Sequence, residues 1–158
     1  MKGTPALVAL DRAGVSYEVC AYDVDPSDGS GYGKAAAAAL GLTERAVFKT
    51  LVAMVDGRAT VAIVPVGAQL SLKALAAAVG GKRAEMADIT VAERITGYVA
   101  GGISPFGQKK RLPTVVDASV EELDVVHVSA GRRGLEVALA PTALIGTTGA
   151  TVAPIASA

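Results

Sequence analysis

Residues 47–66 read VFKTLVAMVDGRATVAIVPV, and this stretch decides the fold class. It contains two apolar runs, Val47 to Val55 and Ala59 to Val66, separated by Asp56-Gly57. Asp-Gly between two such runs is a strong hairpin signal, because both residues tolerate the backbone angles of a tight two-residue turn. The stretch therefore predicts a pair of buried antiparallel strands.

Helix signals lie on both sides of this hairpin. Thr4 is a suitable N-cap, Pro5 suits the first helical position, and Gly14 is a typical stop. The same reasoning predicts further helices over about residues 34–40, 71–79, 88–95 and 141–145. Short apolar or alternating segments predict strands at residues 15–22, 112–117, 125–129 and 135–139.

Strands come in pairs and helices are scattered, without a regular alternation of the two. This order favours an α+β fold with a mixed, largely antiparallel, barrel-like sheet and flanking helices. The length of 158 residues fits one domain, which we place at 1–149, followed by a flexible C-terminal tail at 150–158.

Composition excludes several classes of protein. Lys plus Arg and Asp plus Glu each number 15, so a strongly polybasic nucleic-acid binder is excluded, although a local basic patch is not. With one cysteine, Cys20, and one histidine, His127, we expect no disulfide framework, metal site or cofactor. The uncharged stretch 137–158 is interrupted by Pro and Gly, so we expect a cytoplasmic protein without a membrane span.

Three chemical motifs fail on inspection. Residues 28–35, DGSGYGKA, lack the first glycine of a phosphate-binding loop and the Ser or Thr after its lysine. The acidic residues of 23–28 do not match a calcium-binding loop, since Asp28 stands where glycine is required. Cys20 and His127 fall in separate predicted strands, which favours buried structural roles over a nucleophile pair.

Lys49 interrupts the otherwise apolar strand that begins at Val47. Desolvating an ammonium group is costly unless it reaches solvent, a partner or a polar cavity. Lys49 therefore either extends from a sheet edge into solvent or lines a functional site, and the pattern alone leaves both interpretations open.

The second informative stretch, residues 101–107, reads GGISPFG. We expect the backbone amides of Gly101 and Gly102 to hold a developing oxyanion, and the alternative is an ordinary long turn. Two basic turns accompany this loop, and together they suit RNA. The predicted RNA-binding residues are Lys109, Lys110, Arg111, Arg132 and Arg133.

Several ordered motifs, from Thr4 to about Gly149, resemble the YbaK family of Cys-tRNA(Pro) deacylases. The wider superfamily includes the editing domain of bacterial prolyl-tRNA synthetase and the Ala-tRNA(Pro) deacylases. The resemblance rests on residues 47–51, 65–66, 69–73, 85–88, 96–98, 101–105, 107–113 and 129–135.

The resemblance implies a barrel-like editing domain that hydrolyses mischarged aminoacyl-tRNA. It places the essential lysine at Lys49 and the family's glycine loop at Gly101 to Pro105, and it puts Glu136 where relatives commonly have Asp. The expected catalytic residues are Lys49, Gly101 and Gly102, and the expected substrate-binding residues are Tyr22, Tyr32, Thr50, Ser104, Pro105, Ser129 and Glu136.

The family chemistry is substrate-assisted: the thiol of the attached cysteine attacks its own ester, giving a thiolactone and free tRNA. The expected partners are aminoacylated tRNA(Pro) and prolyl-tRNA synthetase. Two alternatives stay open, namely a deacylase for Ala-tRNA(Pro) or another aminoacyl-tRNA, and a non-catalytic module that binds tRNA or a synthetase.

Overall fold

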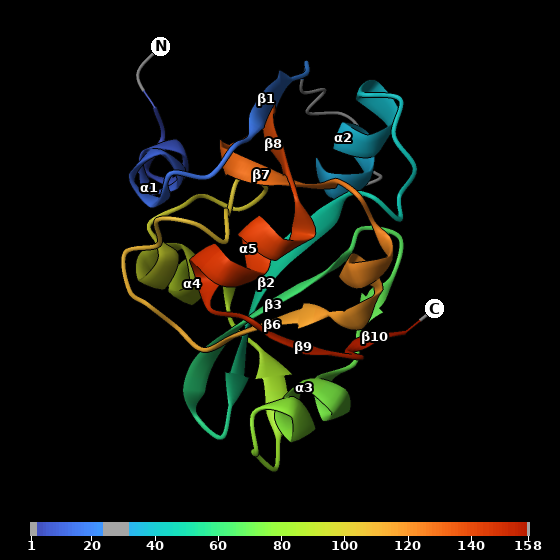
Figure 1. The fold of residues 1–158 in the computed structure, drawn as a ribbon. Coiled ribbons are helices and arrows are strands. Elements are labelled where there is room, and N and C mark those ends of the chain that lie inside the picture. The colour runs from blue at the N-terminus through green and yellow to red at the C-terminus, as the bar shows by residue number, and fades with distance from the viewer. Residues whose placement is uncertain (1–2, 24–31, 158) are drawn as a thin grey trace.

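The computed structural model describes residues 3–23 and 32–157 of the chain, and the helices and strands of this part are shown in Figure 1. In chain order they are α1 (Pro5–Ala13), β1 (Glu18–Ala21), α2 (Tyr32–Ala39), β2 (Phe48–Val55), β3 (Arg58–Pro65), β4 (Gln69–Leu70), α3 (Leu72–Ala78), β5 (Ala84–Met86), α4 (Ile89–Thr96), β6 (Thr114–Asp117), the 3₁₀ helix η1 (Ala118–Glu122), β7 (Val126–Arg132), β8 (Leu135–Leu139), α5 (Pro141–Thr148), β9 (Thr151–Ala153) and β10 (Ala156–Ser157).

The predicted hairpin is confirmed. Strands β2 and β3 pair antiparallel from Phe48 opposite Pro65 to Val55 opposite Arg58. The turn residues Asp56 and Gly57 have φ angles of 49° and 81°, as a tight two-residue hairpin turn requires.

The hairpin forms the middle of a five-stranded sheet with the order β5-β2-β3-β6-β9. Strand β6 runs parallel to both of its neighbours, β3 and β9, whereas β2 pairs antiparallel with both β3 and β5. A second, antiparallel sheet has the order β1-β8-β7 and crosses above the first in Figure 1. A parallel bridge between Val47 and His127 connects the two sheets.

The α+β class with a mixed sheet is therefore confirmed, but the strands do not close into a barrel. They form separate sheets of five, three and two strands among the described residues. Along one edge of β2 the pairing is interrupted. Val47, just before this strand, is bridged to His127 on β7, and β2 pairs with β5 only from Ala53 onward.

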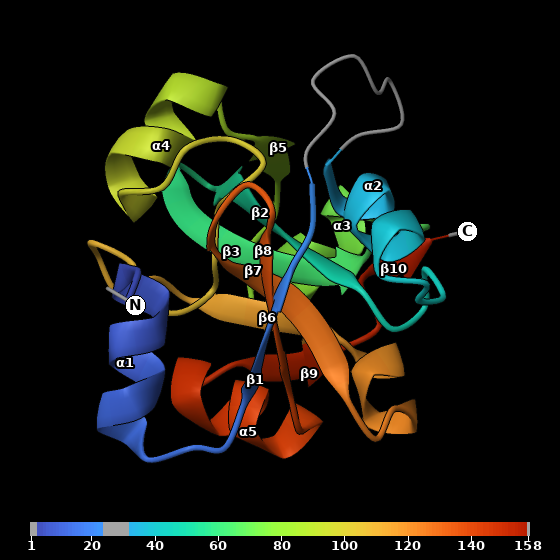
Figure 2. The same ribbon diagram turned by 90° about the horizontal axis from the view of Figure 1, so that it is seen from above.

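Helix α1 packs against β7, and the residues at its two ends explain where it begins and stops. The Thr4 hydroxyl accepts a hydrogen bond from the Leu7 amide (3.3 Å), and Gly14 ends the helix with a φ of 70°. Helices α1 and α2 lie on opposite sides of the β1–β8 pair (Figure 2). Burial of Leu7 and Leu10 on the inner face of α1 fixes it to the main core cluster.

The C-terminal residues differ from the expectation of a flexible tail. Strand β9 pairs in parallel with β6, and β10 pairs with β4. Ile155 is fully buried, and its amide and that of Ala156 donate to the Asp117 carboxylate, both at 2.9 Å. The segment is uncharged and short, but it completes one edge of the sheet.

A search of the described helices for a membrane span finds none of sufficient length and hydrophobicity.

Candidate active site

A cavity of about 280 Å³ opens beside β2, where that strand changes partner. At one end, the His127 amide donates to the Ala46 carbonyl (2.9 Å), and at the other the Ala87 amide donates to the Val52 carbonyl (3.1 Å). Because alternate peptide groups of a strand point to the same edge, the peptide group of Thr50 points into the gap between them. Between these two pairings, β2 therefore leaves backbone amide and carbonyl groups beside the cavity.

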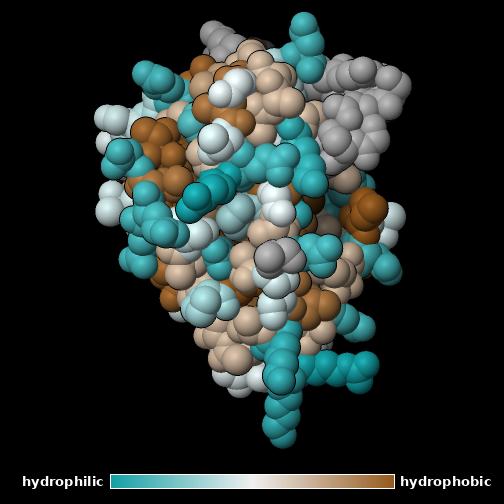
Figure 3. All heavy atoms as spheres, turned by 90° about the vertical axis from the view of Figure 1, so that its right-hand side faces the viewer, coloured by the Kyte–Doolittle hydropathy of each residue, from teal (hydrophilic) through white to brown (hydrophobic). Residues whose placement is uncertain are grey.

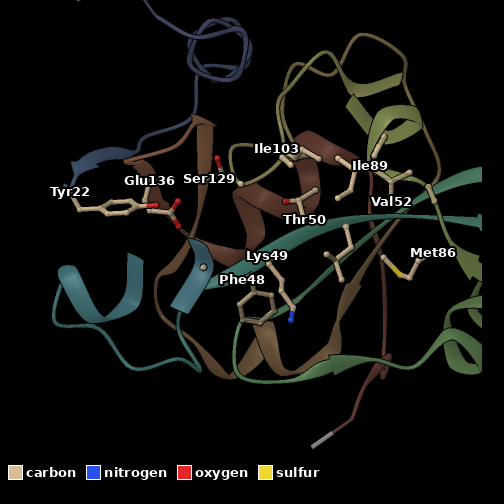
Figure 4. Close-up of a pocket in the computed structure, with 16 residues that line it drawn as sticks. Tyr22, Phe48, Lys49, Thr50, Val52, Met86, Ile89, Ile103, Ser129 and Glu136 are labelled. Carbon is tan, nitrogen blue, oxygen red and sulfur yellow. The ribbon is translucent and has the colours of Figure 1, made fainter. Parts of the chain in front are cut away.

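The β1-β8-β7 sheet forms the opposite wall. Cys20, Glu136 and Ser129 lie in register across its three strands, so their side chains share one face. Tyr22 continues that face, and its amide is held by the Gly134 carbonyl at 2.9 Å. Tyr22, Ser129 and Glu136 all line the cavity, as predicted for substrate-binding residues (Figure 4).

Glu136 is the buried acid of the cavity, with 5% of its surface exposed. Within the described part of the chain, its carboxyl group makes no hydrogen bond and no ion pair. Burial raises the pKa of Glu136 to about 8, because a charged carboxylate loses its hydration there. Burial, and then the charge of Glu136, also raises the pKa of Tyr22.

Lys49 lines the cavity from β2 and is half-buried. Burial lowers the pKa of Lys49, and the neighbouring charge of Lys34 on α2 lowers it further. In Figure 4 its ammonium group lies near Phe48 and well apart from the Glu136 carboxyl group. Lys49 therefore lines a cavity, and its role in a functional site stays a prediction.

Thr50 follows Lys49 on β2 and is also one of the residues that line the cavity. It is 8% exposed, and its hydroxyl oxygen has no hydrogen-bond partner in the described structure. An unpaired buried hydroxyl typically costs about 1–3 kcal/mol, so a bound ligand that pairs with it would recover stabilisation.

The glycine loop contributes less than expected. Gly101 lines the cavity with a φ of 83°, and its amide donates no hydrogen bond to another described residue. The Gly102 amide, by contrast, donates to the Val99 carbonyl at 2.9 Å. In this conformation the Gly102 donor is therefore occupied, and its role in holding an oxyanion stays a prediction.

Ser104 and Pro105 also lie away from the cavity. The buried Ser104 hydroxyl accepts from the Phe106 amide (3.2 Å), which makes it part of a turn. Pro105 lines a second cavity of about 330 Å³, beside α1 and α5. Neither residue lines the first cavity, and substrate binding by Ser104 and Pro105 stays a prediction.

Tyr32 is the first residue of α2, but its side chain lies outside the described part of the structure, as do residues 24–31. The prediction that Tyr32 binds substrate therefore stays a prediction.

The two basic turns border the loop that carries Gly101. The Arg133 guanidinium donates from Nε to the Ala100 carbonyl at 2.7 Å, and the Lys109 amide donates to Thr96. Arg132 is exposed, while Lys110 and Arg111 are exposed beside the second cavity. RNA binding by these five cations stays a prediction.

Sequence reasoning missed the apolar part of the cavity. Met86 and Ile89 line it although 47% and 65% of their surfaces are exposed, and Ile103 also belongs to the lining. Residues 85–88 belong to the pattern shared with the YbaK family, and this resemblance could have pointed to Met86. In sequence alone, however, an exposed apolar side chain cannot be distinguished from a core residue.

Cys20 and His127 form no pair. Cys20 is half-buried on β1, His127 lies on β7, and β8 separates the two strands. Burial, followed by the charges of Glu18 and Glu136, raises the pKa of Cys20 and so opposes thiolate formation. No group of metal-binding side chains occurs in residues 3–23 and 32–157.

Known proteins are similar to this chain in fold and in sequence. A scaffold protein from a computational epitope-grafting study superposes with a TM-score of 0.85 at 24% identity, covering 98% of this chain and 96% of its own. A solved structure described as a candidate trans-editing enzyme for prolyl-tRNA synthetase has a TM-score of 0.79 at 24% identity, with 97% and 93% covered. At these identities the likeness concerns the fold.

Sequence similarity is closer to a protein of Enterococcus faecalis (strain ATCC 700802 / V583), named as a candidate Cys-tRNA(Pro)/Cys-tRNA(Cys) deacylase, EbsC. It is 40% identical over 122 residues, which cover 75% of this chain and 73% of the relative. The family described as the aminoacyl-tRNA editing domain matches residues 31–146, a range that includes most of the cavity lining. The chain therefore belongs to the aminoacyl-tRNA editing domain family.

Proposed function

We propose that this protein is a trans-editing hydrolase that removes cysteine from mischarged Cys-tRNA(Pro). One observation carries the proposal: the cavity between β2 and β8 joins Lys49, Thr50 and Glu136 in a chain that is 40% identical to a protein named for this activity. The site would act on the ester that links the amino acid to the 3′ end of the tRNA.

The size of the cavity favours a small aminoacyl group. At about 280 Å³, it is at the low end of ligand pockets, which are roughly 300–1,000 Å³. An extended nucleotide chain would not fit inside, so the tRNA end would approach from the rim. Lys34 and Lys49 gather positive charge on the α2 side of the cavity, which suits the negatively charged end of the RNA.

The proposed chemistry uses the substrate's own thiol. The sulfur attacks the ester carbonyl carbon, the bond to the 3′ oxygen breaks, and a thiolactone and free tRNA result. Well-aligned intramolecular groups reach effective molarities of about 10⁵–10⁸ M, so the protein's main task is alignment. The free Gly101 amide is the donor best placed to stabilise the oxyanion, since that of Gly102 is occupied.

Selectivity for the tRNA body would come from a partner. The formal net charge is zero, and a protein with few phosphate contacts releases few counterions and binds bare tRNA weakly. We therefore propose association with prolyl-tRNA synthetase, with the exposed turns at Lys109–Arg111 and Arg132–Arg133 touching the RNA.

The test is a substrate panel. Purified protein is mixed with tRNA(Pro) carrying cysteine, alanine, serine or proline, and loss of the labelled amino acid is followed over time. We expect Cys-tRNA(Pro) to be cleaved at least tenfold faster than the serine ester, which has the same shape but a weaker nucleophile. Preference for alanine would favour the Ala-tRNA(Pro) alternative, and binding without cleavage would favour a non-catalytic module.

A further inference from the structure

The most unusual group in the cavity is the unpaired carboxyl of Glu136. Its neighbours across the sheet are Cys20 on β1 and Ser129 on β7. The Ser129 hydroxyl accepts a hydrogen bond from the Gly131 amide at 3.2 Å, and in the described structure it donates none to Glu136. The carboxyl group is thus buried, lines the cavity and has no partner among the described residues.

A second buried acid in the same chain shows what a structural carboxylate looks like. Asp117, 6% exposed, accepts hydrogen bonds from the amides of Ser119, Ile155 and Ala156 and from the Ser119 hydroxyl. Burial alone would raise the pKa of Asp117, but these donors outweigh it and the pKa is lowered. Glu136 lacks such donors, so its position is not explained by stability.

The groups that face Glu136 leave its charge state free to change. Strand β1 presents Glu18 and Cys20, with Tyr22 following it, and strand β7 presents His127 and Ser129. Lys49 lines the same cavity from β2. Lys49 is the cation of this set, and it makes no ion pair with Glu136 in the described structure. No fixed positive charge therefore holds the carboxyl group in its ionised form.

We propose that Glu136 is the proton acceptor for the thiol of the bound cysteinyl group. In this step, the carboxylate removes the S–H proton while the sulfur bonds to the ester carbonyl carbon. As the C–O bond breaks, the same proton passes from Glu136 to the departing 3′ oxygen, so the carboxylate is restored. The inference rests on the proposed function, and it identifies Glu136 as the residue that carries the proton from the substrate thiol to the 3′ oxygen.

The acidity of the two groups is well matched. The pKa of Glu136 is raised to about 8, and that of a free thiol is about 8.5, so proton transfer between them is nearly balanced in energy. A base with a pKa near the operating pH is the most effective general base, and such groups contribute about 10²–10⁴-fold to rate.

The first test compares thiol with selenol substrates. Glu136→Gln keeps the shape of the side chain and removes the base, and we expect single-turnover cleavage of Cys-tRNA(Pro) to slow at least 10²-fold. A selenocysteinyl ester needs no base, because a selenol is far more acidic than a thiol. The substitution should therefore reduce the cleavage rate of this ester at least tenfold less than it reduces that of the cysteinyl ester. Equal losses on both substrates, or full activity of the variant, would overturn the proposal.

The second test measures the carboxyl group without activity. Since the folded-state pKa is raised, the unfolded chain releases the proton first, and stability is fully present below the unfolded pKa near 4.5 and lost as pH rises toward 8. The slope is at most about 1.4 kcal/mol per pH unit. We expect urea unfolding to show this fall in the wild type and a flatter profile in Glu136→Gln. Identical profiles would contradict a raised pKa of Glu136.

The two proposals fail in different ways. A wild type that cleaves no aminoacyl-tRNA overturns the proposed function and this proton transfer with it. A wild type that cleaves Cys-tRNA(Pro), together with an equally active Glu136→Gln variant, overturns the role of Glu136 alone.

Discussion

Thr50 places a buried hydroxyl oxygen against the cavity without a hydrogen-bond partner in the described structure. Replacing it by valine removes the unpaired polar atom and keeps the shape. We expect Thr50→Val to leave the free energy of unfolding unchanged or raise it by about 1 kcal/mol, while the KM for Cys-tRNA(Pro) rises several-fold. Chemical denaturation and steady-state kinetics measure the two effects.

Thr60 supplies the matched control. It is 1% exposed on β3, outside the cavity, and its hydroxyl donates to the Arg58 carbonyl at 3.3 Å. Thr60→Val should lose about 1 kcal/mol of stability and keep its activity. If Thr50→Val lost stability as Thr60→Val does and kept its KM, Thr50 would be a structural residue.

The cavity wall depends on close packing between two loops. A Cβ on Gly102 would lie 2.8 Å from the Cα of Arg132, a backbone atom that cannot move aside alone. We expect Gly102→Ala to destabilise the fold by about 1–3 kcal/mol and to reduce cleavage by displacing the neighbouring Gly101. Thermal unfolding and the deacylation rate test this expectation.

Gly146, which is exposed on α5, is the control for this change. A Cβ there meets nothing within 4 Å, and alanine favours a helix over glycine by about 1 kcal/mol. Gly146→Ala should therefore be neutral or stabilising. Equal behaviour of the two alanine variants would show that the contact at Gly102 does not matter.

Local patterns explain the elements that sequence could predict. The hairpin follows from Asp56-Gly57, and helices α1 and α3 follow from the caps Thr4 and Ser71. Strand β5 (Ala84–Met86) was not predicted, because it is three residues long and forms only since the β2 edge at Ala53–Val55 offers partners. Its pairing is a tertiary effect that no local signal carries.

The candidate site divides in the same way. Lys49 was found from physical chemistry, because a charge interrupts an apolar strand. Glu136 came from the family resemblance alone, since a glutamate within residues 135–139 is also typical of an exposed strand face. Its burial results from the pairing of β8 with both β1 and β7, which sequence spacing does not reveal.

At the scale of the whole molecule, the C-terminus completes the structure. Ile155 is fully buried in the cluster that contains Leu75 and Val115. We expect Ile155→Ala to lower the free energy of unfolding by about 2–5 kcal/mol, as for other buried large-to-small changes. A loss below about 0.5 kcal/mol would instead agree with a loosely attached tail.

The surface of the molecule agrees with weak binding of free RNA. Figure 3 shows hydrophilic and apolar residues interspersed over one face, and the formal net charge is zero. A protein without net positive charge depends on local clusters of cations or on a partner protein to bind tRNA. We expect low affinity for bare tRNA that falls with salt, and a salt-insensitive, nanomolar complex in a binding titration would contradict this.

The central claim is that the ester is cleaved in the cavity lined by Lys49. The most direct measurement is the single-turnover rate of Cys-tRNA(Pro) cleavage by Lys49→Met, which keeps most of the apolar stem and removes the charge. Lys73→Met, on the exposed side of α3, is the control. The account predicts a loss of at least about 10²-fold for Lys49→Met with the fold intact, and an unchanged rate for Lys73→Met. A folded Lys49→Met protein that cleaves at the wild-type rate would contradict it.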